Sequence, residues 1–294
     1  MTLLTVVRDV CMKVGVLAPT SVFSNINGNR TMQEMLSLAN EVAQLIAGDT
    51  REWSRMKTST VCVGDGVSGS FPLPANFKRM LLTTNVWRST SSKTPMRFIS
   101  DTDEWIRRRI DKTANTAFGE WMLMDGKIFI YPALAKNTLS VWSNGTSYYT
   151  IGQPVYDALD DTSWKVVVQH VSSGVGTFAE DRAANPTYWV STPNVPQTAS
   201  YSYLDKNCVN LATGGRGDSF IADGDSFVLD ERLLKLGMIW QWKASKGSAY
   251  AEDMATYSDA MDVAKGSDKP APIIIGKRPI SVNATIAYPW ELPS

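Results

Sequence analysis

The stretch FIADGDSFVLDERLLKLGMIWQWKASKGSAYAED (Phe220–Asp253) decides the fold of this chain. Asp230 is a residue type favoured at helix N-caps, and it directly precedes a run with apolar side chains at helical spacing. The inner face of this predicted helix carries Leu233, Leu236, Trp240 and Ala244. Lys246-Gly247 interrupts the pattern before a second helical run with Tyr250, Met254, Tyr257, Met261 and Ala264. The stretch therefore predicts two consecutive helices that bury apolar stripes.

A second helix pair is predicted at the N-terminus. The first helix ends at Gly15, a helix stop signal, and its apolar residues are Leu3, Val6, Val7, Val10, Cys11 and Val14. After a loop rich in Ser, Asn and Gly, a second stripe closed by Gly48 consists of Met32, Met35, Leu36, Ala39, Val42, Ala43 and Ile46. Two antiparallel helices are the simplest interpretation, with the methionines as core filler.

Between the two helix pairs the pattern becomes that of β-strands. Phe71-Pro72-Leu73-Pro74 predicts a rigid, extended bend, and Asp125-Gly126 between two apolar arms predicts a hairpin. The segment ISDTDEWIRRRI (Ile99–Ile110) predicts a short helix capped by Ser100 or Asp101. The chain is therefore expected to be α+β, a helical bundle with an antiparallel β part.

A different kind of sequence interrupts the β part. From residue 144 to 196 helical periodicity is lost, and aromatic, Gly and Pro residues become frequent. We expect a small all-β module here, inserted into a discontinuous body of residues 1–143 and 197–267, with the two ends of the insertion close together. The remaining residues, 268–294, contain five prolines and are expected to form an extended C-terminal arm.

The composition restricts the class of protein. With 294 residues and 44% hydrophobic content, the chain can bury a large core. Lys+Arg and Asp+Glu both number 29, so no global basic field for nucleic acid is expected. The three cysteines form no CxxC pair, which argues against a zinc site and favours a reducing compartment. Arg8, Asp9 and Lys13 interrupt any signal-peptide pattern, so a soluble intracellular product is expected at synthesis.

Motifs for catalysis and metal binding are weak. His170 is the only histidine, and no GxSxG or Cys-His signature accompanies it, so a structural histidine is favoured. Asp223-Gly224-Asp225 lacks the later Glu of a calcium loop, and a capped turn before the next helix is preferred. Arg216-Gly217-Asp218 matches an adhesion motif over three residues only, which favours a solvated loop. We therefore expect no enzyme activity, no metal-ligating residue and no cofactor.

One basic run is a candidate for contact with nucleic acid. Arg107, Arg108 and Arg109 are consecutive on the predicted short helix and spread around much of its circumference. They are candidate DNA-facing residues through the phosphate backbone. A solvated or intersubunit face is the favoured alternative.

The order of several segments resembles a known family. After the N-terminal helix pair come FPLPANFKRM (71–80), DGKIFIYPALAKNTLSVW (125–142), SYSYLDKNC (200–208) and the segment Phe220–Asp253, followed by a Pro-rich tail. This order resembles the head-to-tail adaptor, or head-completion, proteins of short-tailed bacteriophages. The likeness covers roughly residues 1–143 and 197–294, and its most specific part is Phe220–Asp253.

The resemblance implies a structural virion protein. It implies a helical bundle with a β-rich part that forms a ring, usually twelvefold, between the portal protein and the tail nozzle protein. The ring would line the DNA channel without reading sequence and would offer docking surface to tail fibres. The expected location is the head–tail interface of the virion, after assembly in the host cytoplasm. The residues assigned to a portal-binding arm are Pro270, Ile273, Ile274, Ile275, Lys277, Arg278, Tyr288 and Trp290.

The inserted module is similar to the small β-modules of chitinase-type carbohydrate-binding domains. The matching residues, in order, are Tyr149, Gly152, Val155, Trp164, His170, Phe178 and Trp189. Tyr156, Trp164 and Trp189 are therefore candidate contacts to a partner or a glycan. For Trp164 and Trp189, core packing is the favoured alternative, because a module of this size needs most of its aromatic residues inside. A carbohydrate-binding tail protein is thus the alternative to the adaptor, and a lytic enzyme is disfavoured.

Overall fold

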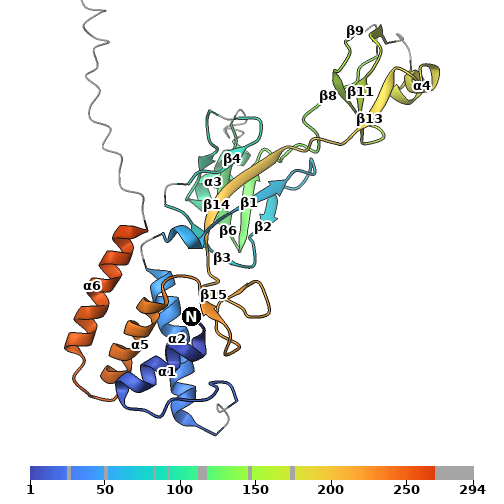
Figure 1. Cartoon of the computed structure of the whole chain (residues 1–294). Helices are drawn as coiled ribbons and strands as arrows, with labels where there is room; N and C mark the ends of the chain where they lie inside the picture. The colour runs from blue at the N-terminus through green and yellow to red at the C-terminus, as the bar shows by residue number, and fades with distance from the viewer. Residues whose placement is uncertain are drawn as a thin grey trace, which may run out of the picture. The chain divides into compact units, whose positions relative to one another are not determined.

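The computed structural model describes residues 1–24, 28–49, 52–82, 84–91, 93–111, 118–144, 148–172 and 176–268 (Figure 1). The chain is a mixed α+β protein, as predicted. It divides into two compact units, Met1–Arg55 with Asn207–Ser294 (unit 1) and Met56–Lys206 (unit 2). The segments predicted to form one discontinuous body are thus shared between two units.

Unit 1 is a helical bundle that takes helices from both ends of the sequence. Its helices are α1 (Leu3–Val14), α2 (Arg30–Gly48), α5 (Glu231–Ser245) and α6 (Ala251–Ser267). Both predicted helix pairs are therefore confirmed. The Asp230 carboxylate accepts a hydrogen bond from the Arg232 backbone N–H at 2.8 Å, as an N-cap residue does. Gly15 ends α1 in the left-handed conformation, with φ of 74°.

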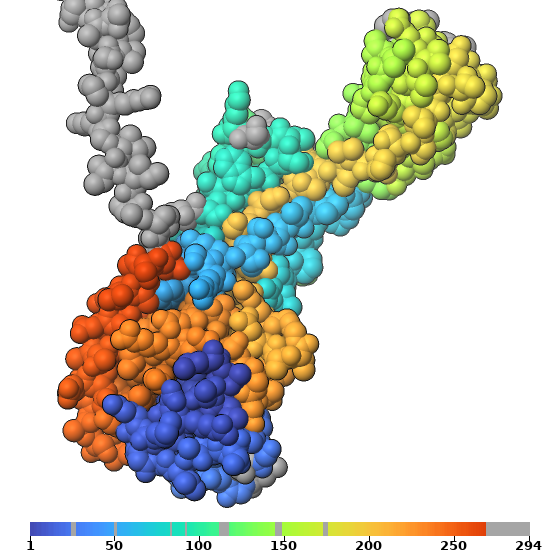
Figure 2. All heavy atoms as spheres, viewed as in Figure 1, coloured from blue at the N-terminus to red at the C-terminus, as the bar shows by residue number. Residues whose placement is uncertain are grey.

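Helix α5 lies at the centre of unit 1 and contacts α1, α2 and α6 (Figure 1). Gly237 permits this packing, because a Cβ atom there would lie 2.5 Å from Val42 Cγ1 of α2 and 3.3 Å from the Tyr257 ring of α6. Helix α6, by contrast, buries only Met261 and runs along the surface of the unit (Figure 2). The bundle thus depends on the close approach of α5 to its neighbours.

A small sheet and its acidic loop complete unit 1. The strands are β15 (Val209–Asn210), β16 (Arg216–Gly217) and β17 (Ser226–Phe227). Asp225 is buried, and its carboxylate accepts hydrogen bonds from the backbone N–H groups of Ile221, Ala222 and Ala212 at 2.7, 2.8 and 2.9 Å. Its oxygens therefore organise the turn before α5, as predicted in preference to a calcium loop.

Unit 2 contains two sheets that share one hydrophobic core. The first sheet consists of β1 (Lys57–Val63), β14 (Thr198–Asp205), β3 (Phe77–Met80) and β4 (Trp87–Arg88), with β14 between β1 and the other two. The second consists of β2 (Ser70–Pro72), β7 (Lys127–Tyr131), β6 (Glu120–Met124) and β5 (Arg97–Phe98). Asp125 and Gly126, with φ of 50° and 64°, form the predicted hairpin turn between β6 and β7.

Two short helices accompany these sheets. The 3-10 helix η1 (Ser54–Met56) leads into β1, and α3 (Thr102–Ile110) follows β5. Asp101 caps α3 by accepting a hydrogen bond from the Asp103 backbone N–H at 2.9 Å. Of the two predicted residues, Asp101 and not Ser100 is therefore the N-cap of α3.

The inserted module forms a part of unit 2 with its own aromatic core. Its main sheet has the order β13 (Trp189–Thr192), β11 (Thr162–Val166), β10 (Pro154–Asp157) and β8 (Ser140–Val141). A second pair is formed by β9 (Tyr148–Tyr149) and β12 (His170–Val171), and helix α4 (Phe178–Ala184) lies between β12 and β13. The module is therefore not all-β, and its sheet begins before residue 144.

The two ends of the module run side by side, as predicted. The Thr138 N–H donates to the Val195 carbonyl at 2.8 Å, and the Gln197 N–H donates to the Ala135 carbonyl at 2.9 Å. The insertion therefore leaves and returns through two hydrogen-bonded segments. None of the helices in the described part of the chain is sufficiently long and apolar to cross a lipid bilayer.

The close packing at Gly237 gives a stability prediction. Gly237→Ala should lower the free energy of unfolding by about 1–2 kcal/mol, because the clash with Val42 exceeds the gain in helix propensity. Gly266→Ala in α6, where a Cβ atom would meet nothing within 4 Å, should instead raise it by about 0.5–1 kcal/mol. Urea unfolding of both variants checks this, and equal stabilisation by the two changes would contradict the packing argument.

Candidate functional site

The predicted basic run is organised around a buried carboxylate. Glu120, on β6, is 0% exposed, and the side chains of Arg108 and Arg109 on α3 are 16% and 20% exposed. Arg108 donates to Glu120 Oε1 through both Nε, at 3.1 Å, and Nη2. Arg109 Nη1 donates to Oε2 at 2.9 Å. Two arginines thus neutralise one buried carboxylate and fasten α3 to the sheet.

The arginines of this cluster have further contacts. The Arg109 guanidinium lies 3.4 Å from the centroid of the Trp105 ring and 4.5 Å from that of Tyr131. The hydrogen bond to Glu120 raises the pKa of Arg108 above its usual range. Of the three predicted DNA-facing residues, Arg108 and Arg109 are therefore used for internal structure, and Arg107 is the exposed member. A DNA-facing role remains a prediction, centred on Arg107.

In the module, Trp189 belongs to the core. It is 5% exposed, and its ring packs edge-on against Phe178 at 4.7 Å and against Tyr149 at 5.5 Å between centroids. Its Nε1 donates to the buried Asp181 carboxylate at 3.1 Å. The favoured alternative of core packing is confirmed for this residue, which has no face open to a glycan.

Trp164 and Tyr156 lie closer to the surface but also have internal partners. Both side chains are partly buried. The Arg182 guanidinium lies 4.2 Å from the centroid of the Trp164 ring, and Arg182 also pairs with Asp160 at 3.0 Å. The Tyr156 hydroxyl donates to Asp161 Oδ1 at 2.8 Å. Part of each ring is therefore occupied by protein contacts.

Asp161 joins the module to its connecting segment. Lys136 Nζ lies 2.6 Å from Asp161 Oδ2. Hydrogen bonds from Lys136 and Tyr156 lower the pKa of Asp161 below its ordinary value. This ion pair is therefore formed in full above the ordinary pKa of Asp and is lost as the pH falls through the lowered value.

The single histidine is enclosed by aromatic rings. His170 Nδ1 donates to the Val168 carbonyl at 2.8 Å, and the imidazole lies 4.8 Å from the Trp189 ring and 4.9 Å from the Tyr188 ring. Its Nε2 lies 3.8 Å from the Asp181 carboxylate. The surroundings are those of a structural histidine, in agreement with the sequence-based expectation.

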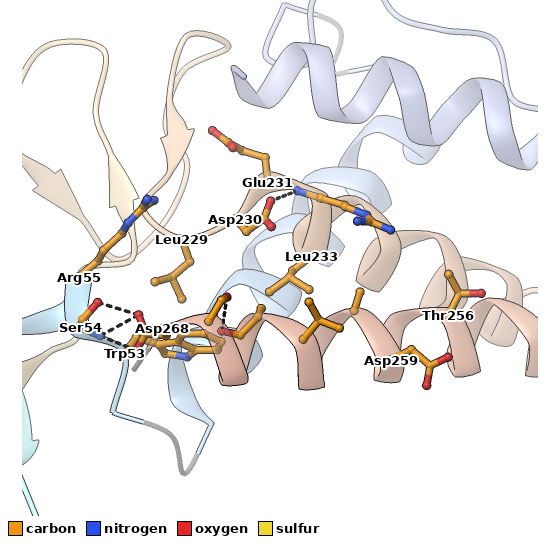
Figure 3. A pocket seen from close by; sticks show the side chains of 15 residues that line it. Trp53, Ser54, Arg55, Leu229, Asp230, Glu231, Leu233, Thr256, Asp259 and Asp268 are labelled. Atoms are coloured by element: carbon orange, nitrogen blue, oxygen red, sulfur yellow. Dashed lines mark hydrogen bonds between the residues drawn. The ribbon is translucent and has the colours of Figure 1, made fainter. Parts of the chain in front are cut away.

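The described residues of unit 1 form, among other surface features, two hollows that differ in their lining. The larger, of about 850 Å³, lies between Trp53–Arg55, the start of α5 and one side of α6 (Figure 3). Asp268, at the end of α6, lines it and accepts hydrogen bonds from the Ser54 N–H at 3.0 Å and the Ser54 hydroxyl at 2.6 Å. Ser54 is thus hydrogen-bonded to a carboxylate, and no histidine is among the residues that line the hollow.

The second hollow, of about 680 Å³, is lined by residues of α2, α5 and α6 and is more apolar. Trp240 and Tyr257 form part of its wall. Burial raises the pKa of Tyr257 to about 12, so its hydroxyl stays neutral under physiological conditions. The wall combines these rings with the ion pair of Asp49 and Lys265, whose charged atoms lie 2.7 Å apart.

In the described ranges, no group of three or more His, Cys, Asp or Glu side chains is arranged to hold a metal ion. Cys11, Cys62 and Cys208 are buried and form no disulfide bond within the described residues. The eight residues predicted for the portal-binding arm lie outside the described residues.

Comparison with known proteins adds no family. No model of a known protein family matches the sequence, and no curated protein matches it either.

The Arg108–Glu120–Arg109 cluster gives a second prediction. Glu120→Gln should lower the free energy of unfolding, because Arg108 and Arg109 lose the charge of their shared buried acceptor, while Arg108 keeps Glu104 at 3.7 Å. Glu41→Gln makes the same chemical change at an exposed position on α2 and should alter stability by less than about 0.5 kcal/mol. Denaturant unfolding of both variants is the measurement. Equal stability of the two variants would contradict a structural role for the cluster.

Trp189 gives a third prediction. Trp189→Ala should destabilise the module by about 3–5 kcal/mol, because a large side chain is removed from a packed core and Asp181 loses a hydrogen bond. Trp87→Ala, at a ring that is 39% exposed, is the control and should cost less. Near-ultraviolet circular dichroism and thermal unfolding report the effect. A Trp189→Ala protein that is as stable as the parent but has altered ligand binding would show that the ring belongs to a binding surface and not to the core.

Proposed function

We propose that this chain is a structural virion protein that forms a ring, twelvefold by family resemblance, joining the portal protein to the tail nozzle protein. The proposal rests on the resemblance of its ordered segments, above all Phe220–Asp253, to head-to-tail adaptors of short-tailed phages. The supporting observation is that Phe220–Asp253 supplies the turn, the central helix α5 and the start of α6 of the bundle. The most specific part of the resemblance is thus also the centre of unit 1.

The arm has a defined starting point. Asp268 caps the end of α6 by its backbone position, and its carboxylate binds Ser54 next to the larger hollow. Residues after Asp268 would therefore start from a fixed place on unit 1. In the proposed mechanism the arm orders on the portal, so that the ring forms only where a portal is present.

The inserted module fits an attachment role better than a glycan-binding role. Trp189 is in its core, and Trp164 and Tyr156 are partly covered by Arg182 and Asp161. We propose that the module holds tail fibres or a neighbouring subunit, while DNA passes through the ring without sequence-specific contact. The chain would act in the host cytoplasm during assembly and at the head–tail interface of the virion afterwards, without enzyme activity or cofactor.

The arm is tested by truncation. Deleting residues 269–294 keeps Asp268 and its bonds to Ser54, so the free energy of unfolding should change by less than about 0.5 kcal/mol. Binding to purified portal protein in a pull-down should be lost, because the proposed contact residues are removed. Retention of portal binding by the truncated chain would refute the role of the arm.

The ring is tested with the full chain. Mixed with portal, it should sediment as a larger closed complex, whereas Glu41→Gln, a surface change on α2, should assemble as the parent does. Absence of any complex between full chain and portal would refute the proposed function. Binding of the full chain to cell-wall polysaccharide, lost in Trp164→Ala, would instead support the glycan alternative.

A further inference from the structure

Strand β1 has one edge to which no strand of the described residues is paired. In its sheet the order is β1-β14-β3, so β1 is terminal and uses only one side, toward β14. The pairing runs without a register shift from Lys57↔Leu204 to Val63↔Thr198. β1 is therefore a regular, seven-residue edge strand.

The groups on the open edge can be assigned from the hydrogen-bond pattern. The Gly64 N–H donates to the Gln197 carbonyl at 2.8 Å, which continues the same antiparallel register. The backbone N–H and C=O groups of successive residues point alternately to the two sides of a strand. Those of Cys62 and Thr60, like those of Gly64, therefore point toward β14. The N–H and C=O groups of Ser59, Val61 and Val63 therefore point to the open edge.

This edge lacks the usual features that prevent strand addition. Val61 and Val63 are 53% and 54% exposed, and β1 contains no proline and no bulge. Its one charged residue, Lys57, is at the first position. In the second sheet of the same unit, by contrast, the edge strand β2 is three residues long and ends in Pro72. β1, with seven residues, is also longer than the other terminal strands described in this unit, and a long, regular edge is suited to accept a strand.

A matching strand sequence occurs in the C-terminal arm. The segment ISVNATI (Ile280–Ile286) has apolar residues at every second position, with polar residues between them: Ile280, Val282, Ala284 and Ile286. It contains no charge and no proline. Strict alternation of apolar and polar residues over these seven positions is the pattern of a strand with one buried face, and such a strand needs a sheet to pair with. The segment lies outside the described residues, so the argument for it rests on sequence.

We propose that the open edge of β1 accepts residues 280–286 of a second copy of this chain as an added strand. Outward N–H and C=O groups of Ser59, Val61 and Val63 would pair with the incoming backbone, and its apolar side chains would cover Val61 and Val63. Each copy then carries one donor segment and one acceptor edge, which are the two halves of a head-to-tail interface that closes into a ring. The inference rests on the proposed function only in that the ring brings copies side by side.

The test adds a synthetic peptide of residues 279–289 to the full chain in the absence of portal. Hydrogen exchange, resolved to single amides, should slow by about tenfold or more at Ser59, Val61 and Val63. The alternate amides of Thr60 and Cys62, already bonded to β14, should not change. A peptide of the same composition in scrambled order, without the alternation, should have no effect. Unchanged exchange at the three outward amides would overturn the proposal.

Variants at one position sharpen the test. Val61→Pro removes one outward N–H, and the peptide affinity should fall about tenfold. Val61→Thr keeps the N–H and the β-branch and should bind the peptide as the parent does. A peptide N-methylated at alternate amides tests the same backbone hydrogen bonds without a change in the protein. The test therefore remains valid even if Val61→Pro misfolds. Undiminished binding of every N-methylated peptide, in either alternation, would refute backbone pairing.

Two further outcomes separate this proposal from others. If the outward amides are already protected in the dilute full chain, and Val282→Lys with Ile286→Lys removes that protection, the arm binds its own chain and the second-copy proposal is wrong. Peptide binding by a chain that fails to bind portal would support the strand addition and refute only the adaptor function. Portal binding by a chain that does not bind the peptide would refute the strand addition and support the adaptor function.

Discussion

The packing of α5 against three other helices is the constraint on which the rest of the structure depends. α1 and α2 come from the beginning of the sequence, and α5 and α6 from near its end. Gly237 brings α5 so close to Val42 that the two helix pairs form one bundle. The intervening chain, Met56–Lys206, must therefore leave and return at one place. The pairing of Lys57 with Leu204 at the base of β1 and β14 satisfies this requirement.

The same arrangement is repeated inside unit 2. The module leaves and returns through the hydrogen-bonded segments around Thr138 and Val195, so it is an insertion within an insertion. A short module of this kind needs its aromatic residues for its own core, which accounts for the burial of Trp189 and the enclosure of His170. The buried aromatic residues therefore serve the module's own core, and what the module offers to a partner is its outer surface.

Local signals in the sequence predicted much of the fold. The Asp230 cap, the Gly15 stop and the Asp125-Gly126 turn act within a few residues, and each has the conformation that its residue types favour. The capping box of Thr177 and Glu180, which begins α4, was a usable signal that the aromatic pattern around it obscured. The hydrogen-bonded segments at the two ends of the module could also be expected, because a chain that leaves a sheet must return near its exit to continue the same sheet.

The candidate sites were harder to predict because their partners are distant in sequence. Nothing near Arg108 indicates that Glu120, on a strand beyond an intervening segment, will bind it. The division into two units and the open edge of β1 likewise depend on which strands pair with each other and which do not. Such features come from tertiary pairing, which periodicity and capping do not encode.

The nested arrangement has a consequence for the order in which the protein is made. At the usual ~5–20 residues per second, the roughly 200 residues between the end of α2 and the end of α5 take about 10–40 s to synthesise. During that time α1 and α2 are complete but lack the helix that covers their apolar faces. The sheets of unit 2 and the inserted module, whose residues are all made earlier than α5, can fold first. The oldest part of the nascent chain is therefore the last to become fully buried.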